Sequence, residues 1–149
     1  NTNEERIGDA VISALFHDLK ENPLNARLEV AKKDPVTKNV TNLTMRIHVP
    51  LSGQIMVPDG TIQRGQFTVY VGVKDGHGSI MSVRQKTLPV TIALADLEKD
   101  PGKEDVYEVE IPVRGKDNMV AIAFRDELGG TASYVAERVD SSEEMADSG

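Results

Sequence analysis

Cysteine and tryptophan are both absent from this 149-residue sequence, and aromatic residues make up only 4% of it. Without cysteine the chain forms no disulfide, offers no thiolate to a metal ion and has no cysteine nucleophile. Few aromatic rings remain that could stack against a sugar. Tyr70 and Tyr134 fall opposite or beside core positions, where either exposure or packing under a loop fits the pattern.

Basic residues are fewer than acidic residues. The sequence has 17 Lys and Arg against 24 Asp and Glu, a net charge of -7. Because nucleic-acid affinity comes mainly from clustered basic residues, we expect no nucleic-acid partner. No apolar run approaches the ~18–20 residues of a membrane span, and the first ten residues lack a signal-peptide pattern. Since the chain begins at Asn1 rather than Met, we expect a mature or excised part of a longer protein.

The first 22 residues are predicted to form a helical lead. Its apolar side chains recur every four positions, at Ile7, Val11, Leu15 and Leu19. Pro23 follows Asn22 and ends the helix, because the residue before proline disfavours helical dihedrals. The apolar stripe has two interpretations: it covers the domain's own core, or it docks against a neighbouring domain.

From residue 25 the apolar period changes from 3.6 to 2, which indicates strands with one buried face. No helical pattern separates them, so the fold is predicted to be a mainly β, antiparallel immunoglobulin-like sandwich of about seven strands over 25–139. A short strand is expected near 55–57 within a long connection. The strands are expected near 26–30, 43–49, 67–73, 88–94, 107–113, 120–124 and 131–139.

Three further expectations follow from the same pattern. Pro89 cannot donate a ladder hydrogen bond, so its strand should lie at a sheet edge or switch sheets. Residues 140–149 are acidic with almost nothing to bury, which predicts a disordered tail. The predicted core contains Leu28, Val30, Met45, Ile47, Val69, Val71, Ile92, Val109, Ile111, Ile122 and Phe124.

Catalytic and metal-binding motifs are missing at every spacing considered. The three histidines, His17, His48 and His77, are too far apart for a helical metal pair, and neither a serine elbow nor a phosphate loop is present. We therefore assign no catalytic residue, cofactor or metal site. Weak calcium binding is the chemical alternative, through acids in turns: Asp34, Asp59, Asp75, Asp126 and Glu127. Asn39 and Asn42 also match the glycosylation pattern, which matters only in a eukaryotic secreted protein.

The stretch 121–135, "AIAFRDELGGTASYV", is predicted to be a hairpin that closes the sandwich. Val120, Ile122 and Phe124 should face the core. Asp126 should cap the turn through its side-chain oxygen, with Gly129 and Gly130 in conformations closed to other residues.

The order of these motifs resembles the C-terminal β-rich region of bacterial von Willebrand factor type A-related proteins. The resemblance runs over most of residues 10–137. It rests on "NPLNARLEV", "NLTMRIHVPLSGQIM", "FTVYVGVKDGHGSIMSVRQKTLPVTI", "VYEVEIPV" and above all "AFRDELGGTAS", where Asp126 and Gly129 or Gly130 occupy the matching places. The adhesion motif of type A domains, DxSxS, is not in this chain.

The resemblance implies a non-catalytic interaction or spacer module of a secreted or envelope-associated bacterial protein. Its partner would be another protein or a neighbouring domain of the same chain. The alternatives are a weak calcium- or carbohydrate-binding module and, less favoured, a sandwich enzyme.

Overall fold

The computed structural model describes residues 21–80 and 84–142. Almost all of the predicted helical lead, and the predicted tail beyond residue 142, lie outside the described residues. Asp140 still belongs to the last strand. The described elements are β1 (Arg27–Pro35), β2 (Val40–Pro50), the 3₁₀ turn η1 (Leu51–Gly53), β3 (Val57–Asp59), β4 (Ile62–Asp75), β5 (Arg84–Ala93), α2 (Leu94–Lys99), β6 (Glu104–Arg114), β7 (Asp117–Asp126) and β8 (Ala132–Asp140).

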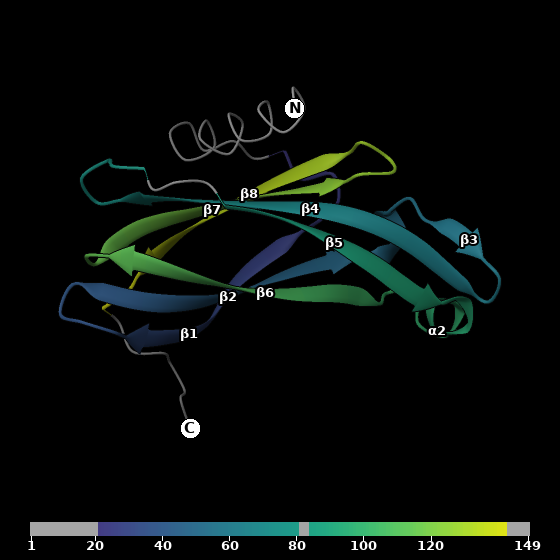
Figure 1. Ribbon diagram of the computed structural model, residues 1–149, viewed down its shortest axis with the longest axis horizontal. Helices are drawn as coiled ribbons and strands as arrows, with labels where there is room; N and C mark the ends of the chain where they lie inside the picture. Colours follow the sequence, from purple (N-terminus) through teal and green to yellow (C-terminus); the bar gives the residue numbers. More distant parts are fainter. Residues whose placement is uncertain (1–20, 81–83, 143–149) are drawn as a thin grey trace.

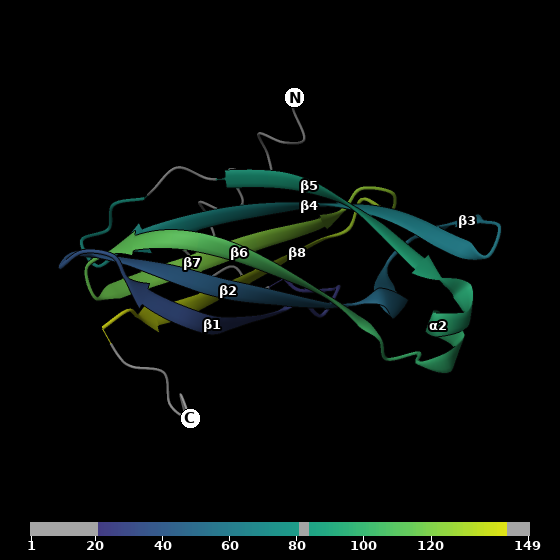
Figure 2. The same cartoon turned by 60° about the horizontal axis from the view of Figure 1, so that its bottom comes forward.

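The strands form two antiparallel sheets that face each other as a sandwich (Figures 1 and 2). One sheet has three strands in the order β1-β2-β6. The other has five, in the order β3-β4-β7-β8, with β5 paired to β4. The predicted antiparallel sandwich is confirmed.

The connection over 50–65 differs from its prediction. The short strand is β3, Val57–Asp59, and it pairs with a β4 that begins at Ile62 rather than near residue 67. Gly60 has a φ of +65°, which lets the chain reverse tightly after Asp59. This hairpin was not predicted, because residues 61–65 alternate only weakly between apolar and polar side chains.

The strand that contains Pro89 was expected to lie at a sheet edge or to switch sheets. Among the described residues β5 pairs with β4 alone, so Pro89 lies in an edge strand as predicted. Pro112 lies in β6, which pairs with β2 and is one of the two edge strands of the described three-stranded sheet. A proline at an edge removes a backbone donor that could otherwise recruit a foreign strand.

The core lies between the sheets and matches the predicted set. Eight of the predicted residues are buried, and Leu28, Val30 and Val109 are partly buried against them. Three aromatic rings join the two layers: Phe67 of β4 lies 4.6 Å from Phe124 of β7, and Tyr107 of β6 lies 6.2 and 6.0 Å from them, centroid to centroid. Such ring pairs add stability beyond their buried area.

Tyr107 makes stability sensitive to alkaline pH. Its hydroxyl donates to Asp105 Oδ2 at 3.0 Å. Burial, followed by the Asp105 carboxylate, raises the pKa of Tyr107 far above its usual value. The folded state therefore keeps this proton at a pH where the unfolded chain, with a tyrosine pKa of about 10, loses it. The contribution of this group to the free energy of unfolding is therefore fully present below about pH 10 and is lost as the pH rises further.

We predict that Tyr107→Phe removes part of this alkaline loss. Urea unfolding at pH 8 and at pH 11 should show a smaller decrease in the free energy of unfolding for the variant than for the parent chain. Equal decreases in the two proteins would contradict the assignment.

Candidate interaction surface

Asp126, the last residue of β7, is 1% exposed and organises one end of the sandwich. Its Oδ1 accepts hydrogen bonds from the backbone N–H groups of Leu128 and Gly129, both at 3.1 Å. The predicted turn cap is thus confirmed. Its Oδ2 also accepts the N–H of Ile55 at 2.7 Å, across 71 residues of sequence. One carboxylate therefore fixes both the β7–β8 turn and the connection before β3.

The two glycines of this turn have different roles. Gly130 has a φ of +77°, as predicted. Gly129 does not have a positive φ, so that part of the prediction is wrong. Instead, a Cβ at Gly129 would lie 2.6 Å from Ile55 Cγ1, closer than packed atoms approach. Glycine is needed there because the Ile55 side chain lies against the turn.

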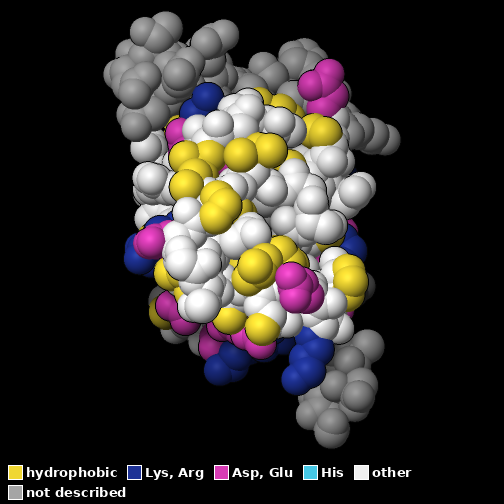
Figure 3. All heavy atoms as spheres, turned by 90° about the vertical axis from the view of Figure 1, so that its right-hand side faces the viewer, with side chains coloured by type: hydrophobic (Ala, Val, Ile, Leu, Met, Phe, Trp, Pro, Cys, Tyr) yellow, Lys and Arg dark blue, Asp and Glu magenta, His cyan; other side chains and the backbone are white. Residues whose placement is uncertain are grey.

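Four large apolar side chains at this end remain exposed, and we call them the apolar end patch. Ile55 and Leu128 lie on the two segments that Asp126 joins. The start of α2 is held nearby, because the N–H of Leu94 donates to the Thr61 carbonyl at 2.9 Å. Figure 3 views this end and shows hydrophobic side chains gathered on it. The patch consists of Ile55, Val57, Leu94 and Leu128, with exposures of 55%, 52%, 38% and 47%.

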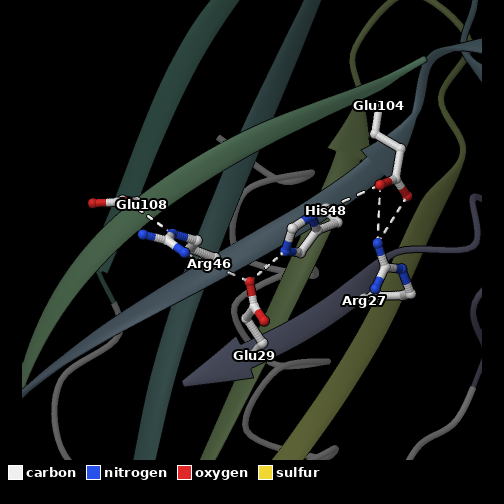
Figure 4. Close-up of polar contacts among 6 residues, drawn as sticks. All are labelled: Arg27, Glu29, Arg46, His48, Glu104 and Glu108. Carbon is white, nitrogen blue, oxygen red and sulfur yellow. Dashed lines mark hydrogen bonds and ion pairs between the residues drawn. The ribbon is translucent and has the colours of Figure 1, made fainter. Parts of the chain in front are cut away.

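The outer face of the three-stranded sheet carries a ladder of charges instead (Figure 4). His48 Nε2 lies 2.8 Å from Glu29 Oε1, and this hydrogen bond is the main reason that the pKa of Glu29 is lowered. Arg46 Nε binds Glu108 Oε2 at 2.9 Å. The ladder is completed by Arg27 and Glu104, which are also 2.9 Å apart.

The alternation of residues 43–49 places His48 on the polar face of its strand. It does lie on that face, but its side chain is only 16% exposed, between Glu29 and, at 3.8 Å, Glu104. Each carboxylate of the ladder has a basic partner, so the ladder ties the strands together rather than presenting a free acid. Exposed pairs of this kind contribute about 0–1 kcal/mol each.

The acids proposed as calcium ligands are dispersed. Each has a hydrogen-bond or ion-pair partner, and in the described part of the chain no three His, Cys, Asp or Glu residues come close enough to hold a metal ion. Backbone donors, chiefly Ser79 N–H, lower the pKa of Asp75. The other partners are Lys32 for Asp34 at 3.3 Å, Arg64 for Asp59 at 2.7 Å and Arg125 for Glu127 at 2.7 Å.

The remaining candidates are also placed. Tyr70 is 2% exposed, so it is not an open platform for a sugar, and Tyr134 is half-buried. Asn39 is exposed at a turn, whereas Asn42 is half-buried within β2. His77 is exposed in the turn after β4, and His17 lies outside the described residues.

A groove of about 520 Å³ runs along the open side of the sandwich between β5 and β6. Its lining is mainly apolar, with charges from Lys86, Glu108 and Glu110. Pro89 and Pro112 lie in the strands that flank it, which limits pairing with a foreign strand. The apolar part of the lining comprises Val69, Val71, Leu88, Val106, Val109 and Ile111, with the ring of Tyr107.

Within residues 21–80 and 84–142, no helix has the length and apolar character needed to cross a membrane. Neither a family model nor a curated protein sequence matches the chain.

Among solved structures, the chain is similar to two β-glucuronidase structures from Bacteroides uniformis, one of them a calcium-binding mutant of β-glucuronidase 2. The identity is 10% in both cases and the TM-scores are 0.49 and 0.50. The match covers 77% of this chain but only 13% of either enzyme. A protein from Archaeoglobus fulgidus is also similar, with 8% identity, 82% and 98% coverage and a TM-score of 0.40. Likeness at this identity concerns the fold alone.

We predict that Asp126→Ala lowers the free energy of unfolding by about 2–4 kcal/mol, because it leaves three partly buried backbone donors without their acceptor, and each fully buried donor so orphaned costs about 1–3 kcal/mol. Asp126→Asn should have a free energy of unfolding between those of the parent chain and Asp126→Ala, since it keeps one acceptor oxygen. Urea denaturation measures both. Asp59→Ala, which removes an exposed ion pair, is the matched control and should change stability by less than about 1 kcal/mol. An Asp126→Ala variant as stable as this control would contradict the structural role.

Calcium should leave the thermal midpoint unchanged, because each candidate acid already has its own partner. A ligand that binds only the folded state raises the midpoint. Melts in calcium and in chelator should therefore superimpose. A rise in calcium that chelator reverses would show that the dispersed acids, or residues outside those described, bind the ion.

Proposed function

We propose that this chain is a non-catalytic interaction module of a larger, secreted or envelope-associated bacterial protein, and that its apolar end patch docks against a neighbouring domain of the same protein. The supporting observation is a set of exposed apolar side chains held on a framework that Asp126 fixes. Apolar side chains gain about 1.5–3 kcal/mol each when they are fully buried. The half-exposed side chains of the patch would gain part of this on docking.

The size of the patch favours a tethered partner. A standard interface between separate proteins involves about 20–30 residues a side. Four central side chains are few for such an interface, even with a polar rim. A domain on the same chain is held at an effective concentration in the millimolar range by a short linker, so a smaller contact is sufficient.

The rigidity of the patch also supports docking. Ile55 cannot move away from the β7–β8 turn without breaking its hydrogen bond to Asp126. Because the contact surface is already ordered, little conformational entropy is lost when it is covered. A mobile apolar loop would lose more.

The proposal includes membership of the von Willebrand factor type A-related group. Its support is the closing hairpin, in which Asp126 and Gly130 have the structural roles that the resemblance needs. Under this proposal, the neighbouring domain would be the type A-like domain that precedes such regions.

The test compares the isolated 149-residue chain with the product of the intact gene by hydrogen–deuterium exchange. We expect residues 51–57, 94–97 and 127–130 to exchange more slowly in the longer protein, because docking covers them. The double variant Ile55→Ser/Leu128→Ser should lose this added protection.

Val106→Ser is the matched control, because Val106 is 50% exposed but lies on β6, in the other sheet. It should keep the protection. Equal exchange in the short and long proteins would overturn docking through the patch and leave a spacer role. Unchanged protection in the double variant would show that another surface docks.

A further inference from the structure

The outer face of the five-stranded sheet is more buried than its position suggests. Ala121 and Ala123 are 0% exposed and Tyr70 is 2% exposed, although these residues alternate with core residues and point away from the other sheet. In the described part of the chain, the second sheet packs on the opposite face and α2 lies at the end of the sandwich (Figures 1 and 2). No described helix or sheet is therefore stacked on this face.

This outer face has the composition of a helix-binding surface. Its centre is made of small residues: Gly72 pairs with Ala121, and Ala121 pairs with Ala136 of β8. Small side chains let a helix approach the sheet closely. Tyr70 and Tyr134 pair with Ala123 from the two neighbouring strands, so two large side chains flank the small residues at the centre of the face. Partly buried Ile80 and Met119 extend the apolar area.

The first described residue, Glu21, lies beside this face. The carbonyl of Glu21 accepts a hydrogen bond from the N–H of Tyr134 at 2.7 Å, which places residue 21 beside β8. After burial, the Glu21 carboxylate is the second cause of the raised pKa of Tyr134, so its side chain also lies near the tyrosine. Residue 21, to which the preceding segment is covalently joined, thus lies at the margin of the apolar face.

The preceding segment also has a matching length and pattern. As a helix, residues 7–19 would be about 20 Å long at 1.5 Å per residue. The four strands from β5 to β8 span about 14 Å, because neighbouring strands lie about 4.8 Å apart. The segment's apolar stripe would thus reach across the whole face, while Asp9 and Ser13 would lie on the opposite side of the helix, in water. The stripe is Ile7, Val11, Leu15 and Leu19.

We propose that residues 7–19 dock as an amphipathic helix on this outer face, with the apolar stripe against Tyr70, Ala121 and Ala123. The sequence left two interpretations of the stripe open, and this proposal selects the first, in which the stripe covers the domain itself. It is not available to a neighbouring domain. The proposal does not rest on the function of the end patch, which lies elsewhere on the sandwich.

The absence of native cysteine makes cross-linking a direct test. Leu15→Cys or Val11→Cys is combined with Met119→Cys or Ala136→Cys in the full chain and oxidised mildly. We expect an intramolecular disulfide in at least one of these four pairs, seen as a mass loss of two hydrogens and a faster band on a non-reducing gel. Ser13→Cys, on the opposite side of the helix, is the matched control and should not cross-link. Cross-linking from Ser13 as readily as from the stripe, or no pair cross-linking, would overturn the proposal.

The second measurement is nitration of tyrosine, followed by mass spectrometry. We expect Leu15→Asp to raise the nitration rate of Tyr70 several-fold, because the stripe no longer covers it, and Ser13→Asp to leave the rate unchanged. Tyr107, which is partly buried against the core and lines the groove, serves as the internal reference for folding, because unfolding would raise its own nitration rate. A protected Tyr70 in Leu15→Asp, with Tyr107 also protected, would overturn the proposal. Disulfides formed only between chains would instead assign the stripe to a second copy of the protein.

Discussion

A single buried carboxylate determines the shape of one end of this protein. Asp126 accepts three backbone N–H groups from two segments that are far apart in sequence. A buried carboxylate is stable only when its oxygens are satisfied, and here backbone donors satisfy them. The consequences extend outward: the hairpin turn is closed, Ile55 is held against Gly129, and the exposed apolar side chains around them keep fixed positions.

The two sheets use their outer faces in different ways. On the three-stranded sheet, the outer face is a ladder of acids and bases whose ion pairs join all three strands, as Figure 4 shows. On the five-stranded sheet, small residues and tyrosines cover the outer face. As a result β4 is buried without interruption from Phe67 to Val73, although its sequence alternates. The first surface is suited to water, and the second is suited to a covering element.

The sequence predicted the sandwich because each strand carries its own periodic signal. A slip of one residue would expose the whole apolar set, so the positions of Met45, Ile47 and Ile122 in the core followed from alternation alone. The cap at Asp126 was also predictable, because the residues that it binds are two and three positions away. These features depend on local sequence.

The features that the sequence did not predict depend on contacts between distant segments. Nothing near Ile55 indicates that its N–H binds Asp126, so the end patch could not be assembled from the pattern. The role of Gly129 was mistaken for a backbone requirement, whereas the constraint is the Ile55 side chain. Tyr70 was left open between exposure and packing, since its burial depends on what lies over the sheet.

The most direct test of the central role of Asp126 is the amide exchange rate of Ile55 in the unaltered 149-residue chain, measured by nuclear magnetic resonance. Ile55 lies outside the strands and its side chain is exposed, so its N–H has no sheet partner to protect it. We predict strong protection, because the N–H is bonded to Asp126 Oδ2. That protection should be lost in Asp126→Ala under conditions where β7 amides stay protected. An Ile55 amide that exchanges in the parent chain as fast as an unstructured one would contradict the account.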